Sequence, residues 1–285
     1  MYETILVGFD ESPSSRAAVI EASHWVKKHG GQLFLVHAVF FDTEELGNAT
    51  EQLEKRLKIG ERVCIEAKET ITKEFNIDAH YVLCEGEPPE VIAEVAQGKH
   101  ADLIMLGTYG RKGLNRLLMG SVTSQVILNS SIDTLIVKKQ CSECTGSYKS
   151  ILVPFDGSEF SKKALTRACQ LSKIDRADVT VMYVIPRYEE MIDFFKTDSI
   201  KNSLHQEAIK IISRAVALAN IQGITPKTEI AEGHAAEKTV ETAQRLKTDL
   251  IAMGSHGYRG INKAIMGSTA ERVIMNSTCP VLVVR

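Results

Sequence analysis

Residues 101–130 read ADLIMLGTYGRKGLNRLLMGSVTSQVILNS, and residues 248–277 follow the same plan as TDLIAMGSHGYRGINKAIMGSTAERVIMNS. Each copy passes from a short apolar run through the pattern G-x2-G-x9-G-S into a second periodic stretch. This order indicates a buried strand, a glycine loop and a helix that starts near the serine. Between 107–127 and 254–274, 9 of 21 positions are identical without a gap, which indicates a duplicated unit.

The duplication extends over the whole chain of 285 residues. The matching segments, in chain order, are 3–12 with 149–158, 33–40 with 179–186, 85–96 with 232–243, 101–110 with 248–257, and 134–139 with 280–285. In the second of these pairs we place Val39 opposite Val184. The repeat is much longer than a solenoid unit, so we expect two domains. We predict domain 1 at 1–140, a linker at 141–149 and domain 2 at 150–285.

Short apolar runs alternate with helical patterns within each half. In the first half the expected strands are 4–9, 32–40, 79–84, 101–107 and 134–139. Ser12 followed by Pro13 is typical of a helix start, and 44–75 suits one long amphipathic helix or a broken one. This alternation predicts an α/β fold in which each half is a doubly wound parallel sheet with helices on both faces.

Ligands of such sheets bind beyond the carboxyl ends of the strands, where the strand order reverses. Asp10 and Asp156 follow the first strand of each half, and Val39 and Val184 end the second. The glycine loops begin where the fourth strands end. We therefore expect these segments to meet in one crevice per half.

The glycine loops suit either an anion or a plain structural turn, and the exact duplication of their spacing favours binding. Glycine allows backbone N–H groups to approach a ligand closely, and a helix N-terminus adds free N–H donors and partial positive charge. Ser121 and Ser268 have two compatible roles, phosphate contact and N-capping, and Ser268 with Glu271 forms the S-x-x-E capping-box pattern. The loops lack the lysine of a Walker motif. Their basic residues are Arg111, Lys112, Arg116, Arg259 and Lys263.

Several residues keep two interpretations. Asp10 and Asp156 suit hydrogen bonds from a nucleoside, or they shape the turn before the helix. Three histidines near the strand ends, His37, His234 and His256, lack a paired nucleophile or metal-ligand spacing and are expected in loops or packing.

Composition excludes some classes of function. The net charge of −2 gives no sign of a nucleic-acid partner, and no apolar run is long enough for a membrane span. No secretory signal is visible, so we expect a cytoplasmic protein. Cys141 and Cys144 form an isolated C-x2-C in the linker, which is half of a zinc site at most.

Taken together, VGFDES and VPFDGS, a valine at the end of the second strand, the two glycine motifs and the closing VLVV strand resemble the universal stress protein family. The resemblance covers nearly the whole chain as two tandem copies. It implies a five-stranded, Rossmann-like parallel sheet per domain and, for members with this glycine motif, ATP in the crevice. The nucleoside would lie at Asp10 and Asp156, with backbone groups of Val39 and Val184 beside the adenine. The residues implied around ribose and phosphates are Gly107, Gly110, Gly120, Ser121, Val122 and Thr123, and Gly254, Gly257, Gly267, Ser268 and Thr269.

The resemblance also implies pairing of last strands, here 134–139 with 280–285, as an intrachain pseudo-dimer, and a homodimer is a further option. The leading hypothesis is an ATP-binding regulatory protein of the stress response, with Mg2+ or Mn2+ on the phosphates as an option and a regulatory protein partner of unknown identity. The alternatives are a slow ATPase or self-phosphorylating enzyme, and a scaffold with empty crevices. No catalytic residue is assigned.

Overall fold

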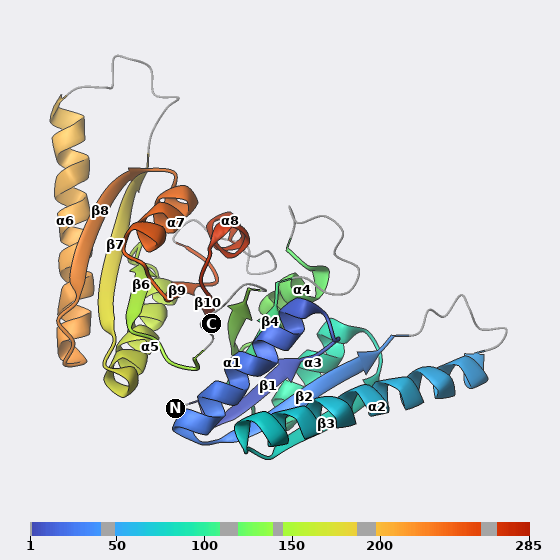
Figure 1. Ribbon diagram of the computed structural model, residues 1–285. Helices are drawn as coiled ribbons and strands as arrows, with labels where there is room; N and C mark the ends of the chain where they lie inside the picture. The colour runs from blue at the N-terminus through green and yellow to red at the C-terminus, as the bar shows by residue number, and fades with distance from the viewer. Residues whose placement is uncertain (1, 41–48, 109–118, 139–144, 187–197, 258–266) are drawn as a thin grey trace. The chain divides into compact units, whose positions relative to one another are not determined.

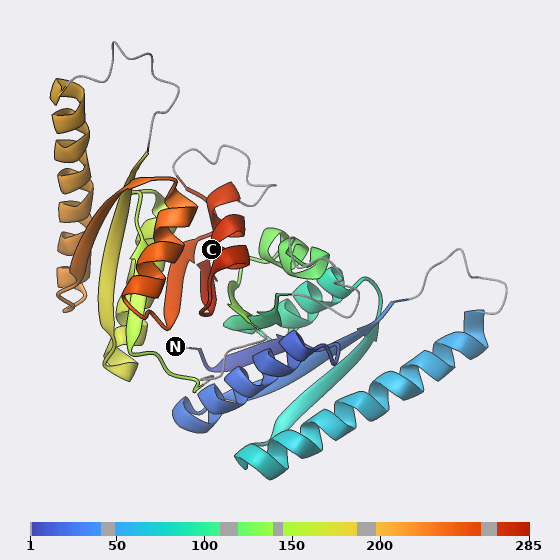
Figure 2. The same ribbon diagram turned by 45° about the horizontal axis from the view of Figure 1, so that its top comes forward.

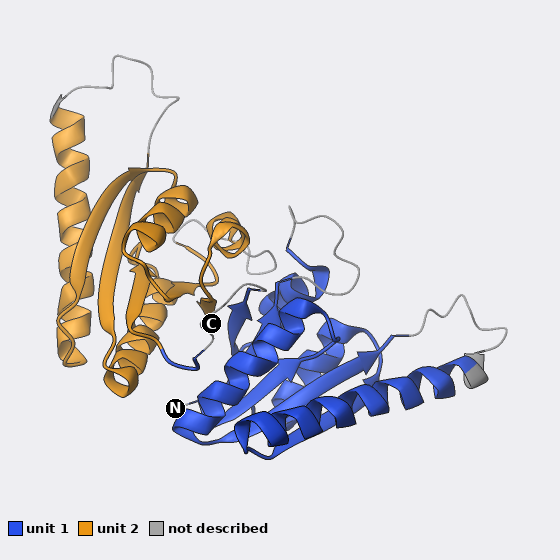
Figure 3. Ribbon diagram, in the orientation of Figure 1, with its two compact units in different colours: residues 1–147 blue, residues 148–285 orange. Residues whose placement is uncertain are grey.

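The computed structural model describes residues 2–40, 49–108, 119–138, 145–186, 198–257 and 267–285. Contacts divide the chain into two compact units, Met1–Ser147 and Tyr148–Arg285 (Figure 3).

In its described residues, unit 1 alternates strands and helices (Figure 1). Its elements are β1 (Thr4–Gly8), α1 (Pro13–His29), β2 (Gln32–Val39), α2 (Ala49–Phe75), β3 (Ala79–Glu85), α3 (Pro88–Gly98), β4 (Leu103–Gly107), α4 (Ser121–Asn129) and β5 (Asp133–Val137). Every pairing of neighbouring strands is parallel, in the order β3-β2-β1-β4-β5. The order reverses between β1 and β4, as in a doubly wound sheet.

Unit 2 has the same plan. Its elements are β6 (Ser150–Pro154), α5 (Glu159–Asp175), β7 (Asp178–Pro186), α6 (Asp198–Ile221), β8 (Lys227–Gly233), α7 (Ala235–Arg245), β9 (Leu250–Gly254), α8 (Ser268–Asn276) and β10 (Val281–Val284). The parallel strand order is β8-β7-β6-β9-β10. The predicted fold class is thus confirmed in both halves.

Helices cover both faces of each sheet. In unit 1, α1 packs with α2 on one face and α3 packs with α4 on the other, which the views of Figures 1 and 2 show together. Between the sheet and the α3/α4 layer lies a core of buried side chains that includes Leu6, Val36, Ile92, Leu106 and Val126. Central strands are apolar throughout because both of their faces are buried.

The helix starts follow from local sequence. Ser12 caps α1, its hydroxyl accepting from the Ser15 N–H at 3.2 Å, and Pro13 fills the first turn as predicted. Ser158 caps α5 in the same way. Of the predicted 44–75 segment, the described part forms one unbroken helix, α2.

The strand register corrects one alignment. Gly8 pairs with Val36 in unit 1 and Pro154 pairs with Met182 in unit 2, so equivalent residues of the second strands are 146 positions apart. Val184 is therefore the counterpart of Ala38, and not of Val39 as expected. A shift of one residue in a strand exchanges its two faces, so this correction matters for the site.

Candidate functional site: a crevice at the ends of the parallel strands

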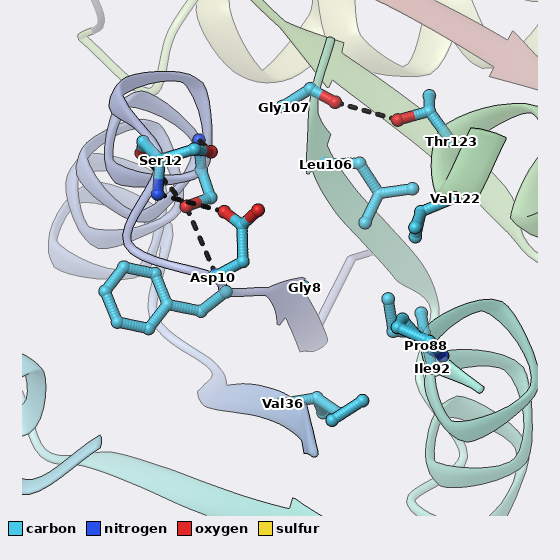
Figure 4. Close-up of a pocket in the computed structure, with 13 residues that line it drawn as sticks. Gly8, Asp10, Ser12, Val36, Pro88, Ile92, Leu106, Gly107, Val122 and Thr123 are labelled. Atoms are coloured by element: carbon cyan, nitrogen blue, oxygen red, sulfur yellow. Dashed lines mark hydrogen bonds between the residues drawn. The ribbon is translucent and has the colours of Figure 1, made fainter. Parts of the chain in front are cut away.

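Unit 1 holds a cavity of about 120 Å³ at the carboxyl ends of β1, β2 and β4, where the strand order reverses (Figure 4). This is the place at which doubly wound folds bind ligands. The lining residues are Gly8, Phe9, Asp10, Ser12, Ser15, Val36, Ala38, Pro88, Ile92, Leu106, Gly107, Val122 and Thr123. Segments from the whole length of the unit thus meet around one space.

The second strand contributes Val36 and Ala38 to the lining of the cavity, and Val39, whose backbone was expected beside the base, is not among the lining residues. Side chains alternate along a strand, so residues 36 and 38 share a face and Val39 faces the other layer. Val39 is buried, and its carbonyl accepts from the Gly86 N–H at 3.2 Å. Sequence reasoning missed both Val36 and Ala38, and side-chain alternation along the strand is the signal that links the two.

Asp10 lines the cavity on the loop after β1. Its Oδ1 accepts from the Ser12 N–H at 3.0 Å, and Oδ1 of Asp156 accepts from the Ser158 N–H at the same distance. The turn-shaping interpretation is therefore confirmed for both residues. In unit 2 the other carboxylate oxygen, Oδ2 of Asp156, would lie 2.7 Å from a Cβ built on Gly257.

The first glycine of each loop allows close packing. A Cβ on Gly107 would lie 2.5 Å from the backbone carbonyl carbon of Ser14, and one on Gly254 would lie 2.6 Å from Cβ of Phe160. Since no side chain fits there, these glycines let the first turns of α1 and α5 contact the ends of β4 and β9. They thereby position the loops that carry Asp10 and Asp156.

The third glycine of each loop is the N-cap of a helix. Gly120 precedes α4 and Gly267 precedes α8, and neither helix has a side-chain cap. The predicted N-capping by Ser121 and Ser268, including the capping box with Glu271, is therefore wrong. Both serines are exposed first residues of their helices.

The amides at these helix starts are suited to an anion. The N–H groups of Gly120 and Gly267 donate to the carbonyls of Thr108 and Ser255 at 3.0 and 3.2 Å, so they are engaged. The first hydrogen bond within α4 is Ser124 N–H to Gly120 O. The N–H groups of residues 121–123 and 268–270 have no acceptor inside their helices and carry the positive end of the helix dipole.

The two units differ at the next positions. Val122 lines the cavity, whereas the Thr123 hydroxyl donates to the Gly107 carbonyl at 2.8 Å and so ties α4 to β4 (Figure 4). Unit 2 has Thr269 and Ala270 there, and Ala270 has no hydroxyl for the corresponding bond. Thr123 therefore holds the start of α4 against the end of β4, next to the cavity.

Two of the three histidines are buried. His37 places Nδ1 2.8 Å from the Phe9 carbonyl, and His256 places Nδ1 3.0 Å from the Ser255 hydroxyl with its ring 5.3 Å from that of Phe160. His234 is the N-cap residue of α7, without a side-chain cap bond. These are the expected packing and loop positions.

Some predicted residues lie outside the described part of the chain. They are Gly110, the five basic residues of the loops, and the pair Cys141 and Cys144. Within the described ranges, no three His, Cys, Asp or Glu side chains gather as a metal site. None of the helices in those ranges is long and apolar enough to cross a membrane.

Comparison with known proteins agrees with this geometry. The family model described as "Universal stress protein family" matches residues 1–138 and again 147–285. A universal stress protein of Methanocaldococcus jannaschii is 36% identical over 140 residues, which cover 48% of this chain and 82% of that protein. One of Mycolicibacterium smegmatis is 23% identical over 291 residues, which cover 99% of this chain and 96% of that protein.

The same fold occurs in a crystal structure of a universal stress protein from Archaeoglobus fulgidus. Its TM-score is 0.78 at 20% identity, over 100% of this chain and 99% of that one. Both halves of the chain carry the family's sequence pattern, and both carry its fold. The chain therefore belongs to the universal stress protein family, as a member with two family domains in tandem.

Proposed function

We propose that this chain binds ATP in the crevice of each unit and acts as a nucleotide-dependent regulatory protein of the stress response. The observation that carries the proposal is the unit 1 cavity, which combines apolar walls, a carboxylate and a helix start with free amides. Those are the three kinds of group that a base, a ribose and a phosphate chain require.

From the lining residues we propose a place for each part of the nucleotide. Val36, Ala38, Ile92 and Leu106 offer apolar contacts to the base. Asp10 lies beside them and accepts hydrogen bonds from ribose or exocyclic N–H groups. The cavity of about 120 Å³ is smaller than the roughly 300–1,000 Å³ of sites that enclose drug-sized ligands. It therefore fits the nucleoside end, and the phosphates would extend to the amides at the start of α4.

Unit 2 offers equivalent groups. Asp156, Val184 and the start of α8 occupy the same places in the strand order as Asp10, Ala38 and the start of α4. The base would meet larger side chains, because Pro154 replaces Gly8 and Val184 replaces Ala38. We propose a second nucleotide there with a different affinity. Mg2+ or Mn2+, where present, would be held mainly by the phosphates.

Regulation suits the site better than catalysis. Among the described residues that line the unit 1 cavity, Asp10 is the one with a titratable side chain, and its Oδ1 already holds the turn. Hydrolysis needs a positioned base for the attacking water and neutralisation of the phosphate charge. We therefore expect ADP release far below the roughly 1–1,000 per second of ordinary enzymes. Turnover in that range would contradict the regulatory assignment.

Isothermal titration with ATP tests the proposal, together with mass spectrometry of any nucleotide released when the protein is denatured. Ala38→Phe fills the unit 1 cavity and should remove one binding event. Ala38→Val is its matched control, because valine occupies this position in unit 2, and it should keep binding. Asp10→Asn retains an oxygen for the Ser12 N–H and isolates the loss of carboxylate charge. A wild-type protein that takes up no adenine nucleotide would refute the proposal.

A further inference from the structure

Unit 1 contains another, larger cavity, which residues of α1 and α2 line. These two helices lie on the face of the sheet opposite α3 and α4 (Figure 1). The volume of this cavity is about 230 Å³. The lining residues are Phe9, Glu11, Arg16, Val19, Ile20, Val63, Glu66, Ala67, Thr70, Ile71, Glu74 and Phe75. We call it the α1/α2 groove, and apart from Phe9 it shares no lining residue with the nucleotide crevice.

The walls of the groove are apolar and its rim is acidic. Val63, Ile71 and Phe75 of α2 are buried, and Ile20 of α1 is 41% exposed although it is a large aliphatic side chain. Three carboxylates line the groove, from Glu11, Glu66 and Glu74, against the guanidinium of Arg16. A second guanidinium, that of Arg62 outside the lining, lies 3.5 Å from the Glu66 carboxylate, so the carboxylates outnumber these cations by one. The groove therefore combines a surface for a hydrocarbon body with an excess of negative charge.

The guanidinium of Arg16 is a cation that the groove already holds within the chain. Arg16 is largely exposed, lies 3.5 Å from the Glu11 carboxylate and stands 5.9 Å above the centre of the Phe9 ring. A carboxylate beside an aromatic face is a favourable place for positive charge. The negative charge of Glu11 also acts on a buried thiol of α2. Burial, and then the charges of Glu11 and Glu61, raise the pKa of the Cys64 thiol to about 11.

Glu11 occupies a position that suits glycine. Its φ of +62° lies in the left-handed region, which side chains other than glycine enter at a cost. The counterpart in unit 2 is Gly157, with φ +84°. Unit 2 also has Lys162 and Thr166 where unit 1 has Arg16 and Ile20. The carboxylate of Glu11 and the apolar side chain of Ile20 therefore have no equivalent in unit 2, and in unit 1 a strained backbone holds the carboxylate at the rim.

We propose that the α1/α2 groove binds a small organic cation with an apolar body, that is, an amphiphilic amine. The ammonium group would lie among the carboxylates of Glu11, Glu66 and Glu74. The hydrocarbon body would pack against Ile20 and Ile71. This site is separate from the nucleotide crevice, so the proposal does not depend on ATP binding.

The test uses 4-phenylbutylammonium as the probe and methyl NMR of the full chain as the readout. The expected result is saturable shifts of the Ile20 and Ile71 methyl groups. The probe 4-phenylbutyrate has a similar body with the opposite charge and should leave them unmoved. Equal response to both probes, shifts at other methyl groups alone, or no shift up to the solubility limit of the amine would overturn the proposal.

Charge variants with opposite signs separate binding from damage to the fold. Glu11→Gln should weaken amine binding by about two- to fivefold, the effect of one partly exposed charge. Arg16→Gln should strengthen it, because the amine no longer competes with a guanidinium for Glu11. If both variants weaken binding, or neither changes it, the electrostatic assignment is wrong.

The strain at Glu11 gives a further comparison. Glu11→Gly should raise the melting temperature, since glycine adopts this φ without a Cβ clash, and should weaken amine binding as Glu11→Gln does. His100→Gly is the matched control, because His100 also has a positive φ, of 51°, and lies outside the groove. It should leave amine affinity unchanged. Equal amine affinity for Glu11→Gly and wild type would overturn the role given to the Glu11 side chain.

Discussion

Replacing Gly107 by alanine should destabilise unit 1. The new Cβ would lie 2.5 Å from the carbonyl carbon and 2.6 Å from Oγ of Ser14, where ordinary contacts begin at 3.4 Å. The first turn of α1 would have to move by about 0.9 Å, and the obstacle includes backbone that cannot rotate away. Overpacking of this kind costs about 1–3 kcal/mol. For a unit of this size that corresponds to a fall in melting temperature of roughly 3–10 °C.

Calorimetry of wild type, Gly107→Ala and Gly98→Ala measures this effect. Gly98 ends α3 and has no atom within 4 Å of an added Cβ, so its replacement should be neutral or slightly stabilising. Two compact units need not unfold in one step. Gly254→Ala, which would crowd Phe160, identifies the transition of unit 2. If Gly107→Ala is as stable as Gly98→Ala, packing is not the reason for the glycine.

Three further outcomes are expected. Thr123→Val keeps the shape of a buried side chain but removes its hydrogen bond to the Gly107 carbonyl, so urea denaturation should show a loss of about 1–2 kcal/mol; an unchanged midpoint would mean that the bond contributes nothing. Cys64 and Cys169 are buried, and desolvation raises both thiol pKa values to about 11. At pH 8 only about one in a thousand of these thiols is a thiolate, so an alkylating reagent should leave both unmodified in the folded protein. Because these folded-state pKa values exceed the ordinary value of 9.0, the stability that the two thiols contribute is complete below pH 9 and is lost as the pH rises towards 11. In denaturation measured against pH, the double alanine variant should therefore lose stability less steeply than wild type in the alkaline range. An equal loss of stability in both proteins would contradict the assignment.

The fold was predictable because the sequence states it twice. Apolar runs of strand length alternate with helical patterns in both halves. Where a segment of one half could be read as helix or strand, the matching segment of the other half helps to decide. The start of α1 was also predictable, because Ser12 and Pro13 act through bonds within one turn.

The site was less predictable because it depends on which face of a strand a residue occupies. Val39 and Ala38 are neighbours in sequence, yet one packs under α2 and the other lines the crevice. A register shift of one residue was enough to exchange them. Sequence similarity between two short apolar runs cannot fix that register, whereas the strand pairing does.

The glycines illustrate a second limit. The motif predicts backbone freedom and ligand contact at every glycine, but Gly107 and Gly254 are explained by the helix turns that press against them. Likewise the S-x-x-E pattern at Ser268 predicts a capping box, yet the helix begins one residue earlier in the motif than that box requires. Tertiary packing decided both cases. The pairing of 134–139 with 280–285 stays a prediction.

Phe9 lines both the nucleotide crevice and the α1/α2 groove, so the two sites share one residue. An occupant that shifts Phe9 from one side changes the room available on the other. Thermodynamic linkage then makes the effect reciprocal: the factor by which an amine alters nucleotide affinity equals the factor by which the nucleotide alters amine affinity. Titrating either ligand in the presence of the other would report that coupling directly.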